Sequence, residues 1–330
     1  VSRALGRQTA SPVTSSPVMM TPSVFRRVCS LSRAALLLLV GRALSAQDAA
    51  PRLLRPTDID RLPVQTNGLR IAYGRDSLQF GELRVPSGRG PFPVAIVLHG
   101  GCWYGPYASV RNAAPLADAL AAAGVATWNV EYRRYDHPGG GWPGTFTDVA
   151  DATDHLRQLA ASHPLDTTRI VSVGHSAGAQ LAAWLATRGQ LASTSELYRA
   201  TPVRLTGVVA LGGVMDLREF QARQRASCGN PAVESLLGGL PDAVPERLRE
   251  VSPIERLPLG VPHEHVAGAL DPIAPRDILE TFASAARGRG DSVTVTIVPG
   301  LGHHDIMAPR TEAGSAAIAA VRRLLGLPRH

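Results

Sequence analysis

Short runs of apolar residues alternate with longer amphipathic segments along most of the chain, and this rhythm predicts strands and helices. From residue 94 onward the short runs are almost continuously apolar and rich in β-branched residues, as in strands covered by helices on both faces. The predicted strands span residues 94–98, 125–132, 169–173, 205–211, 263–267 and 293–298, and the predicted helices span 114–123, 145–161, 179–188, 278–286 and 314–325. This order predicts an α/β fold with a mostly parallel central sheet and helices on both of its faces.

The segments outside this rhythm define the rest of the organisation. Residues 69–73 and 78–85 alternate between apolar and polar positions, which predicts an antiparallel hairpin at the edge of the sheet. Residues 47–65 show little periodicity and predict an N-terminal arm that leads into one domain spanning 66–330. The polar, turn-rich stretch 216–251 interrupts the rhythm, and we expect it to form a small cap over the carboxyl edge of the sheet.

The pentapeptide Gly174-His-Ser-Ala-Gly178 lies between a predicted strand and a predicted helix. Small residues two positions on either side of a serine let the backbone turn sharply without a clash, which exposes the hydroxyl of Ser176. The amides at the start of the following helix then point at whatever the hydroxyl attacks. The alternative is a glycine-rich turn with an incidental serine, but the flanking strand and helix favour a nucleophile.

Asp271 and His303 follow Ser176 in chain order, and each lies in a loop directly after a predicted strand. In this arrangement His303 would take the proton of the serine hydroxyl and return it to the leaving group, while Asp271 would hold the imidazole in the required tautomer. Asp216, which follows strand 205–211, stays open as an alternative acid or as a helix cap.

The segment His99-Gly-Gly-Cys-Trp103 follows strand 94–98 directly. Paired glycines after a strand let the backbone approach a ligand closely and turn its amides inward. We expect the amides of Gly101 and Cys102, together with that of Ala177, to hold the oxyanion that develops during acyl transfer.

Three further groups of residues each have a catalytic and a structural interpretation. His263 and His265 share one face of a strand, a geometry that can bind a metal, but no third ligand at suitable spacing accompanies them, so we expect packing and no metal. Side chains that could line a substrate pocket, or pack as ordinary aromatic residues, are Trp103, Tyr104 and Trp142. A solvated helix face is predicted for Asp148, Asp151 and Asp154.

The formal net charge of +7 comes almost entirely from residues 1–46, which hold six arginines and no acidic residue. The remainder of the chain carries a net charge of only +1 and has no electrostatic footprint for nucleic acid. Arginines ahead of the apolar run 34–40, and small residues at 43–46, predict an export signal over 1–46 that is cleaved near Ala46, preceded by an upstream extension. The apolar run is too short for a permanent membrane span. We therefore expect a periplasmic or secreted protein.

Two cysteines, Cys102 and Cys228, remain after the predicted signal. An oxidising compartment permits one disulfide between them, but their positions in the sequence neither support nor exclude it.

These motifs together resemble the α/β-hydrolase superfamily, and within it the serine hydrolases of the esterase and kynurenine-formamidase type, over about residues 66–328. His99–Trp103 resembles their H-G-G-x-W motif, and Gly212–Arg218 resembles a segment after the sixth strand. The segment Gly302-His-His-Asp-Ile resembles their catalytic-histidine segment, in which an aromatic residue and an aspartate follow the histidine. The resemblance implies that His303 is the base. Because His304 stands where the family has an aromatic residue, an exchange of their roles stays open.

The sequence is therefore interpreted as an exported serine hydrolase that cleaves a carboxylic ester, or an aryl formamide or other amide, through an acyl-enzyme. Its substrate would be a small molecule, and the reaction needs no cofactor. The export signal argues against kynurenine formamide itself, since those formamidases are usually cytosolic. The alternatives are a serine peptidase of the prolyl-oligopeptidase type, whose usual propeller is far larger than the arm here, and a non-catalytic binding protein on the same fold. The oligomeric state is not predicted.

Overall fold

The computed structural model describes residues 52–328, so the predicted export signal lies outside the described residues. Within these residues eight strands form one sheet in the order β1-β2-β4-β3-β5-β6-β7-β8. The strands are β1 (Leu69–Ala72), β2 (Phe80–Arg84), β3 (Phe92–Leu98), β4 (Ala126–Val130), β5 (Leu165–His175), β6 (Gly207–Leu211), β7 (His263–Gly268) and β8 (Val293–Val298). β1 and β2 form the predicted antiparallel hairpin, β2 pairs antiparallel with β4, and all other neighbouring strands are parallel. The predicted α/β class and mostly parallel sheet are confirmed.

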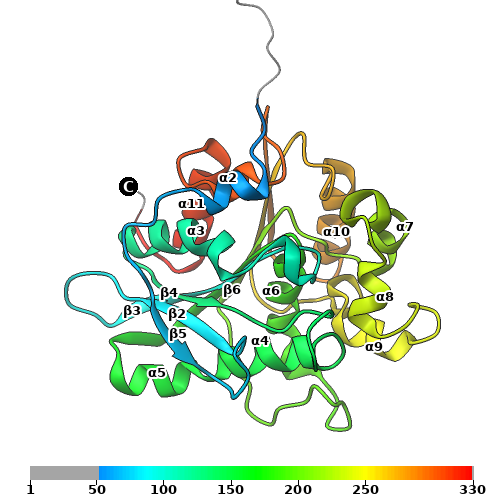
Figure 1. The fold of residues 1–330 in the computed structure, drawn as a ribbon, viewed down its shortest axis with the longest axis horizontal. Coiled ribbons are helices and arrows are strands. Elements are labelled where there is room, and N and C mark those ends of the chain that lie inside the picture. Colours follow the sequence, from blue (N-terminus) through cyan, green and yellow to red (C-terminus); the bar gives the residue numbers. More distant parts are fainter. Residues whose placement is uncertain (1–51, 329–330) are drawn as a thin grey trace, which may run out of the picture. The chain divides into compact units, whose positions relative to one another are not determined.

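Helices connect the strands and cover both faces of the sheet (Figure 1). In chain order they are α2 (Pro56–Asp60), α3 (Val110–Ala122), α4 (Gly144–Asp154), α5 (Leu156–Ser162), α6 (Ala177–Thr187), α7 (Leu217–Cys228), α8 (Ala232–Leu237), α9 (Pro245–Val251), α10 (Arg276–Gly288) and α11 (Glu312–Leu324). Short 3₁₀ turns are η1 (Gly105–Tyr107), η2 (Arg188–Gln190), η3 (Pro253–Arg256) and η4 (Asp305–Met307). No helix in the described part of the chain is long and apolar enough to cross a bilayer.

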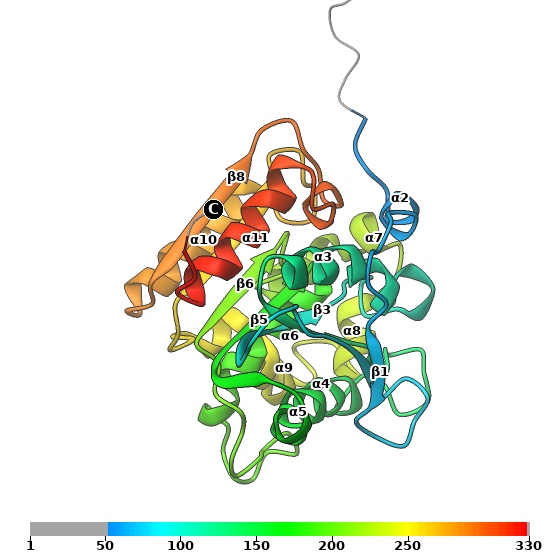
Figure 2. The ribbon, with the colours of Figure 1, turned by 90° about the vertical axis from the view of Figure 1, so that its left-hand side faces the viewer.

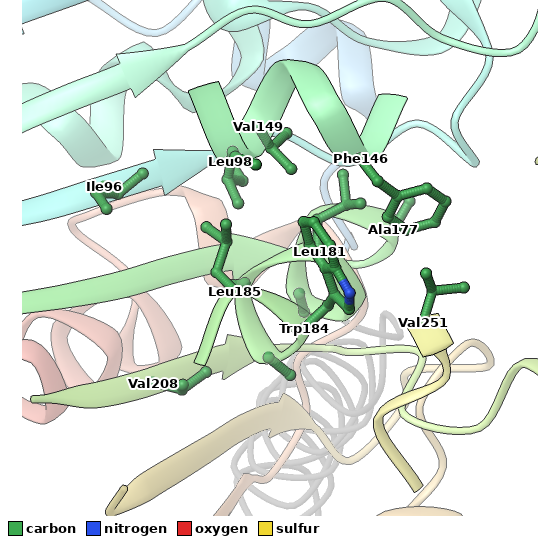
Figure 3. Close-up of a cluster of buried hydrophobic side chains, with 14 of the residues drawn as sticks. Ile96, Leu98, Phe146, Val149, Ala177, Leu181, Trp184, Leu185, Val208 and Val251 are labelled. Atoms are coloured by element: carbon green, nitrogen blue, oxygen red, sulfur yellow. The ribbon is translucent and has the colours of Figure 1, made fainter. Parts of the chain in front are cut away.

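Alternate residues of the central strand β3 enter two different cores. Val94, Ile96 and Leu98 pack with α4, α5 and α6, whereas Ala95 and Val97 pack with α3 and α11. Figure 2 shows α3 and α11 on one side of the sheet and α4 and α5 on the other, and Figure 3 shows Ile96 and Leu98 facing the side chains of α4 and α6. Burial on both faces explains why the parallel strands read as continuous apolar runs.

The single helix predicted over 145–161 is two helices, α4 and α5, separated at His155. The indole N–H of Trp128 donates to the carbonyl oxygen of Ala152 at 2.9 Å. In a continuous helix that carbonyl would accept from the amide of Leu156, and a side chain inserted into this ladder is a usual cause of a break.

The prediction that Asp148 lies on a solvated helix face is wrong. Its side chain is fully buried and accepts hydrogen bonds from Arg133 Nε at 2.9 Å and Gln79 Nε2 at 2.7 Å. The three-residue spacing on α4 could not reveal this, because both donors come from segments that precede the helix by many residues. Asp151 on the same helix is exposed, as expected.

The predicted arm also contains an element that periodicity missed, the five-residue helix α2. Proline at its first turn suits a helix start, and Asp58 Oδ2 accepts from the amide of Arg55 at 3.0 Å. Ile59 is fully buried in the core shared with α3 and α11, so residues 56–60 pack onto the domain.

Candidate active site

Ser176 lies on a strained turn between β5 and α6, with φ 55° and ψ −119°. A positive φ is uncommon for any residue other than glycine. A Cβ at Gly178 would lie 2.3 Å from the carbonyl oxygen of Leu98, and one at Gly174 would lie 2.0 Å from the carbonyl oxygen of Gly178. Only glycine fits at both positions. The amide of Ser176 donates to the Leu211 carbonyl at 2.8 Å, which fixes the turn to the neighbouring strand.

The side chains of His303 and Asp271 form a pair, in which Asp271 is buried and His303 is partly exposed. His303 Nδ1 lies 2.8 Å from Asp271 Oδ2, and Asp271 Oδ1 accepts from the amides of Ile273 at 2.8 Å and Ala274 at 3.1 Å. These two amides hold the carboxylate in place while it faces the imidazole. Gly212, with φ 53°, permits the approach, since a Cβ there would lie 2.7 Å from Asp271 Oδ2. The Nε2 edge of His303 is thereby directed away from the carboxylate.

His175 connects the serine turn to the loop that carries His303. Its Nε2 lies 2.9 Å from the carbonyl oxygen of His303, and the two ring centroids are 4.4 Å apart. Burial, together with the neighbouring His303 and His304, lowers the pKa of His175 well below its usual value, so the ring is neutral and its Nε2–H donates. Because His175 directly precedes Ser176, this bond ties the loop of His303 to the serine turn, and both residues line the same cavity.

Asp216 and His304, the alternative acid and base, lie outside the His303–Asp271 pair. Asp216 caps α7 by accepting from the amides of Arg218 at 2.9 Å and Glu219 at 3.1 Å. The ring of His304 packs 5.6 Å from that of His175, and burial lowers the pKa of His304 to about 4. The carboxylate of Asp271 therefore pairs with His303, although both histidines line the same cavity.

The segment after β3 turns sharply through three consecutive residues with positive φ: Gly101 at 94°, Cys102 at 51° and Trp103 at 53°. The carbonyl of Gly101 accepts from the amide of Tyr104 at 2.8 Å. Loops of this kind can aim successive amides at one anion. Ala177 is the first residue of α6, where backbone amides have no partner within the helix. Gly101 and Cys102 line the same cavity as Ser176, and Ala177 follows Ser176 directly in the chain.

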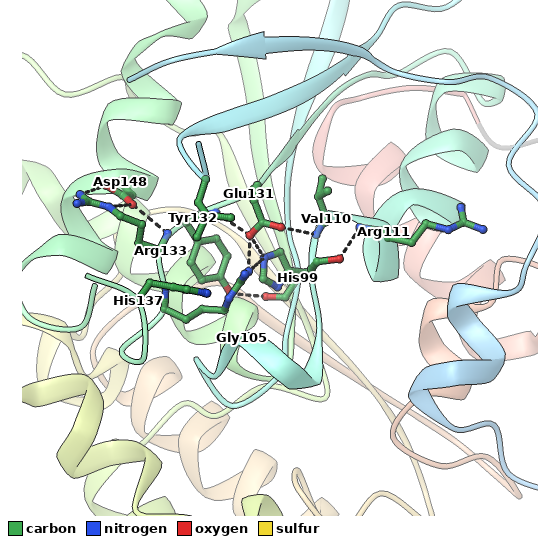
Figure 4. A network of polar contacts seen from close by, with 12 residues as sticks. His99, Gly105, Val110, Arg111, Glu131, Tyr132, Arg133, His137 and Asp148 are labelled. Carbon is green, nitrogen blue, oxygen red and sulfur yellow. Dashed lines mark hydrogen bonds and ion pairs between the residues drawn. The ribbon is translucent and has the colours of Figure 1, made fainter. Parts of the chain in front are cut away.

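A buried carboxylate that the sequence analysis missed supports this turn (Figure 4). Glu131 Oε1 lies 3.0 Å from His99 Nε2, Oε2 accepts from the amide of Val110 at 3.0 Å, and Arg134 forms an ion pair with the same carboxylate. Burial by itself would raise the pKa of Glu131, but His99, Arg134 and the Val110 amide outweigh it and lower the pKa to about 2. Tyr132 adds a hydroxyl donated to the carbonyl of His99 at 2.7 Å. Glu131 is the one charged residue in the predicted strand 125–132, and this was the available signal.

Replacing Glu131 with glutamine is expected to lower the free energy of unfolding by about 3 kcal/mol, because it leaves buried Arg134 without its counter-charge. The lowered pKa means that this stabilisation is complete above about pH 4.5 and is lost as the pH falls toward about 2. Urea denaturation of both proteins at pH 7 and at pH 3 measures the difference. The control is Glu219→Gln, which removes a partly exposed pair with Arg223 and should cost less than about 1 kcal/mol. Equal losses in the two variants would contradict this role for Glu131.

The helix α7 is tied to the turn after β3 by a disulfide between Cys102 and Cys228, with the Cα atoms 6.1 Å apart. The hydroxyl of Tyr107 also donates to the carbonyl of Cys228 at 2.9 Å. Trp103 packs edge-on against Phe220 of α7, with ring centroids 6.4 Å apart. The first helix of the predicted cap segment is therefore bound covalently to the turn that holds the predicted oxyanion donors.

We expect Cys228→Ser to lower the thermal unfolding midpoint. The disulfide joins residues 126 positions apart, so on the chain-entropy account its loss could remove up to about 4 kcal/mol of stability. Thermal unfolding with and without reductant measures the effect. Reductant should lower the midpoint of the wild type to that of the variant and leave the variant unchanged. A wild type whose midpoint does not respond to complete reduction would contradict the prediction.

Ser176 opens onto a cavity of about 430 Å³, which we call the Ser176 cavity. Its lining comes from the serine turn, the segment after β3, the Asp271 and His303 loops, α7 and the arm: Leu53, Leu54, Pro56, Gly101, Cys102, Tyr107, Ala108, Asn112, His175, Ser176, Ser227, Leu270, Pro272, Ile273, His303 and His304. The volume is in the range of small-molecule sites.

The three aromatic residues predicted as pocket candidates lie outside the lining of the Ser176 cavity. Trp103 is fully buried, Tyr104 stacks on Tyr135 with centroids 5.4 Å apart, and Trp142 donates its indole N–H to Glu196 Oε1 at 3.2 Å. These contacts fit the alternative interpretation, in which the three residues pack as ordinary aromatic side chains. Apolar lining instead comes from Leu53 and Leu54 of the arm and from Leu270 and Ile273, which flank Asp271.

His263 and His265 are buried and contact each other, with Nδ1 of the first 2.8 Å from Nε2 of the second. Both rings pack near Phe282, and burial followed by the neighbouring His263 lowers the pKa of His265 to about 3. Among residues 52–328 no group of three or more histidines, cysteines or carboxylates is arranged to hold a metal ion.

The sheet order, the serine turn and the loops at its carboxyl edge define the α/β-hydrolase fold, which confirms the α/β-hydrolase resemblance seen in the sequence. Residues 83–276 match the BD-FAE family model, and the chain belongs to this family. No curated protein matches the sequence.

Solved structures share the fold at low sequence identity. A truncated carbohydrate esterase from gut microbiota is 21% identical, with a TM-score of 0.67 over 80% of this chain and 97% of that one. Propionate-bound esterase 2 of the planctomycete Thermogutta terrifontis is 20% identical, with a TM-score of 0.65 over 81% and 98%. A bacterial heroin esterase is 23% identical, with a TM-score of 0.62 over 82% and 88%.

Proposed function

We propose that this protein is a serine esterase that cleaves a carboxylic ester of a small molecule through an acyl-enzyme. Ser176 is the nucleophile, His303 the general base and Asp271 the group that orients the imidazole. The observation that carries the proposal is the His303–Asp271 pair, 2.8 Å apart, on the same cavity as a serine held at positive φ. The sequence order of the three residues is also that of α/β-hydrolases.

The reaction follows from this geometry in two halves. Ser176 Oγ attacks the ester carbonyl carbon as its proton passes to His303 Nε2, and the amides of Gly101, Cys102 and Ala177 hold the oxyanion. His303 then protonates the alcohol oxygen, the carbon–oxygen bond breaks, and the acyl group stays on Ser176. Water attacks the acyl carbon as its proton passes to His303, and His303 then donates that proton to Ser176 Oγ as the Oγ–carbon bond breaks, which releases the acid and restores the serine.

The names of the structural relatives favour an ester, rather than an amide or a peptide, as the substrate. The three structural relatives described above are named as esterases, and the cavity has the size of a small-molecule site. We also propose that the protein is exported and works in an oxidising compartment. The disulfide between Cys102 and Cys228 supports this, since such bonds persist mainly outside the cytosol.

A substrate panel tests the proposal. We expect the purified protein to hydrolyse p-nitrophenyl acetate with a higher kcat/KM than an aryl formamide or a short peptide p-nitroanilide. A preference for the formamide or the anilide would reassign the enzyme as an amidase or a peptidase. No hydrolysis of any member by folded protein would favour the non-catalytic binding protein.

A further inference from the structure

The arm ahead of the sheet forms part of the wall of the Ser176 cavity. Leu53, Leu54 and Pro56 all line it, although they lie more than a hundred residues before the serine. Leu53 and Leu54 are half-buried, and Leu54 also packs against the core shared with α3 and α11. An arm that only connected an export signal to the domain would not need apolar side chains at this place.

Contacts with α3 fix the arm in position. Ile59 of α2 is fully buried, and Asn112 Nδ2 donates to the carbonyl of Pro56 at 3.4 Å. Arg111 Nη2 donates to the carbonyl of Leu62 at 2.9 Å. The segment that forms this wall is therefore held by α3 at the start of α2 and just after its end.

The arm also contacts the loop that carries His303. The buried carboxylate of Asp305 accepts from the amide of Gly302 at 2.9 Å through Oδ2 and from the amide of Leu54 at 3.4 Å through Oδ1. A Cβ at Gly302 would lie 2.9 Å from Leu53 Cδ1. One carboxylate thus holds together the arm and the residue next to His303, which places the arm on the histidine side of the cavity.

The position of His303 decides which part of a substrate meets this wall. The base returns its proton to the leaving oxygen, so the alcohol portion of an ester must lie on the histidine side of the serine. We propose that the arm is the wall of the alcohol subsite and that Leu53 and Leu54 select esters with an apolar alcohol. This inference rests on the proposed function.

The test compares two substrate series on the double variant Leu53→Ala, Leu54→Ala. One series fixes the acetyl group and varies the alcohol, from methyl acetate to hexyl acetate. The other fixes p-nitrophenol and varies the acyl group, from acetate to hexanoate. Removing side chains that contact an apolar group should lower kcat/KM for hexyl acetate by about tenfold, with methyl acetate changed by less than about twofold. The preference within the acyl series should not change.

Leu62→Ala is the matched control, because Leu62 belongs to the same arm and packs against the core but does not line the cavity. It should leave the alcohol preference of the enzyme as in the wild type. A shift in the acyl series instead, no shift in either series, or the same shift in Leu62→Ala would each overturn the inference. If the wild type hydrolysed no ester at all, the proposed function itself would fail, which is a different result.

Discussion

Ser176→Ala is expected to lower kcat for p-nitrophenyl acetate by about 10⁴-fold to 10⁶-fold, the range seen when a serine hydrolase loses its nucleophile. The variant should fold normally. Serine already carries a Cβ at φ 55°, so alanine adds no atom and no new backbone strain to the turn. Initial rates measure the loss, and circular dichroism with thermal unfolding checks the fold.

Ser227 offers a matched control, because it lines the same cavity from α7 and has no role in the proposed reaction. Ser227→Ala should keep activity within about threefold, well under the cost of a lost catalytic group. A Ser176→Ala protein that keeps more than a small fraction of wild-type activity would mean that hydrolysis does not use this serine.

The second large effect is expected from His303→Ala, with a loss in kcat of at least about 10⁴-fold. The Asp271 carboxylate lies 2.8 Å from Nδ1 of His303, and this carboxylate pairs with His303 rather than with His304. His304→Ala should therefore cost less than about tenfold in kcat, through packing against His175 and His303. Steady-state kinetics of the two variants on the same ester measure the contrast.

Asp271→Asn completes this comparison. Because the side chain still fills its place but no longer favours the reacting tautomer, we expect a severe loss that is somewhat smaller than that of His303→Ala. If His304→Ala abolishes hydrolysis while His303→Ala does not, the base has been assigned to the wrong histidine.

Local patterns predicted the sheet and its helices well. Strands such as 94–98 are buried on both faces, so each appears in the sequence as a continuous apolar run that marks its bounds. The serine turn was equally visible, since Gly174 and Gly178 are demanded by backbone oxygens within 2.3 Å of their absent Cβ atoms. Both features leave a local pattern in the sequence, an apolar run for the strands and two glycines around Ser176 for the turn.

Features that depend on distant partners could not be predicted from the sequence. Asp148 is buried because Arg133 and Gln79 reach it, and the helical spacing of aspartates around it carries no sign of those partners. Leu53 and Leu54 line the cavity only because Asp305 and α3 hold the arm there. The choice between His303 and His304 likewise needed the position of the Asp271 carboxylate, which no spacing provides.

Labelling with a fluorophosphonate probe tests the central claim most directly, because the probe bonds only to a serine that a neighbouring base activates. Intact-mass analysis of the wild type should show one adduct per chain, and peptide mapping should place it on Ser176. Ser176→Ala should stay unlabelled, while Ser227→Ala should label as the wild type does. A folded wild-type protein that takes up no probe, or takes it up at another serine, would contradict the account.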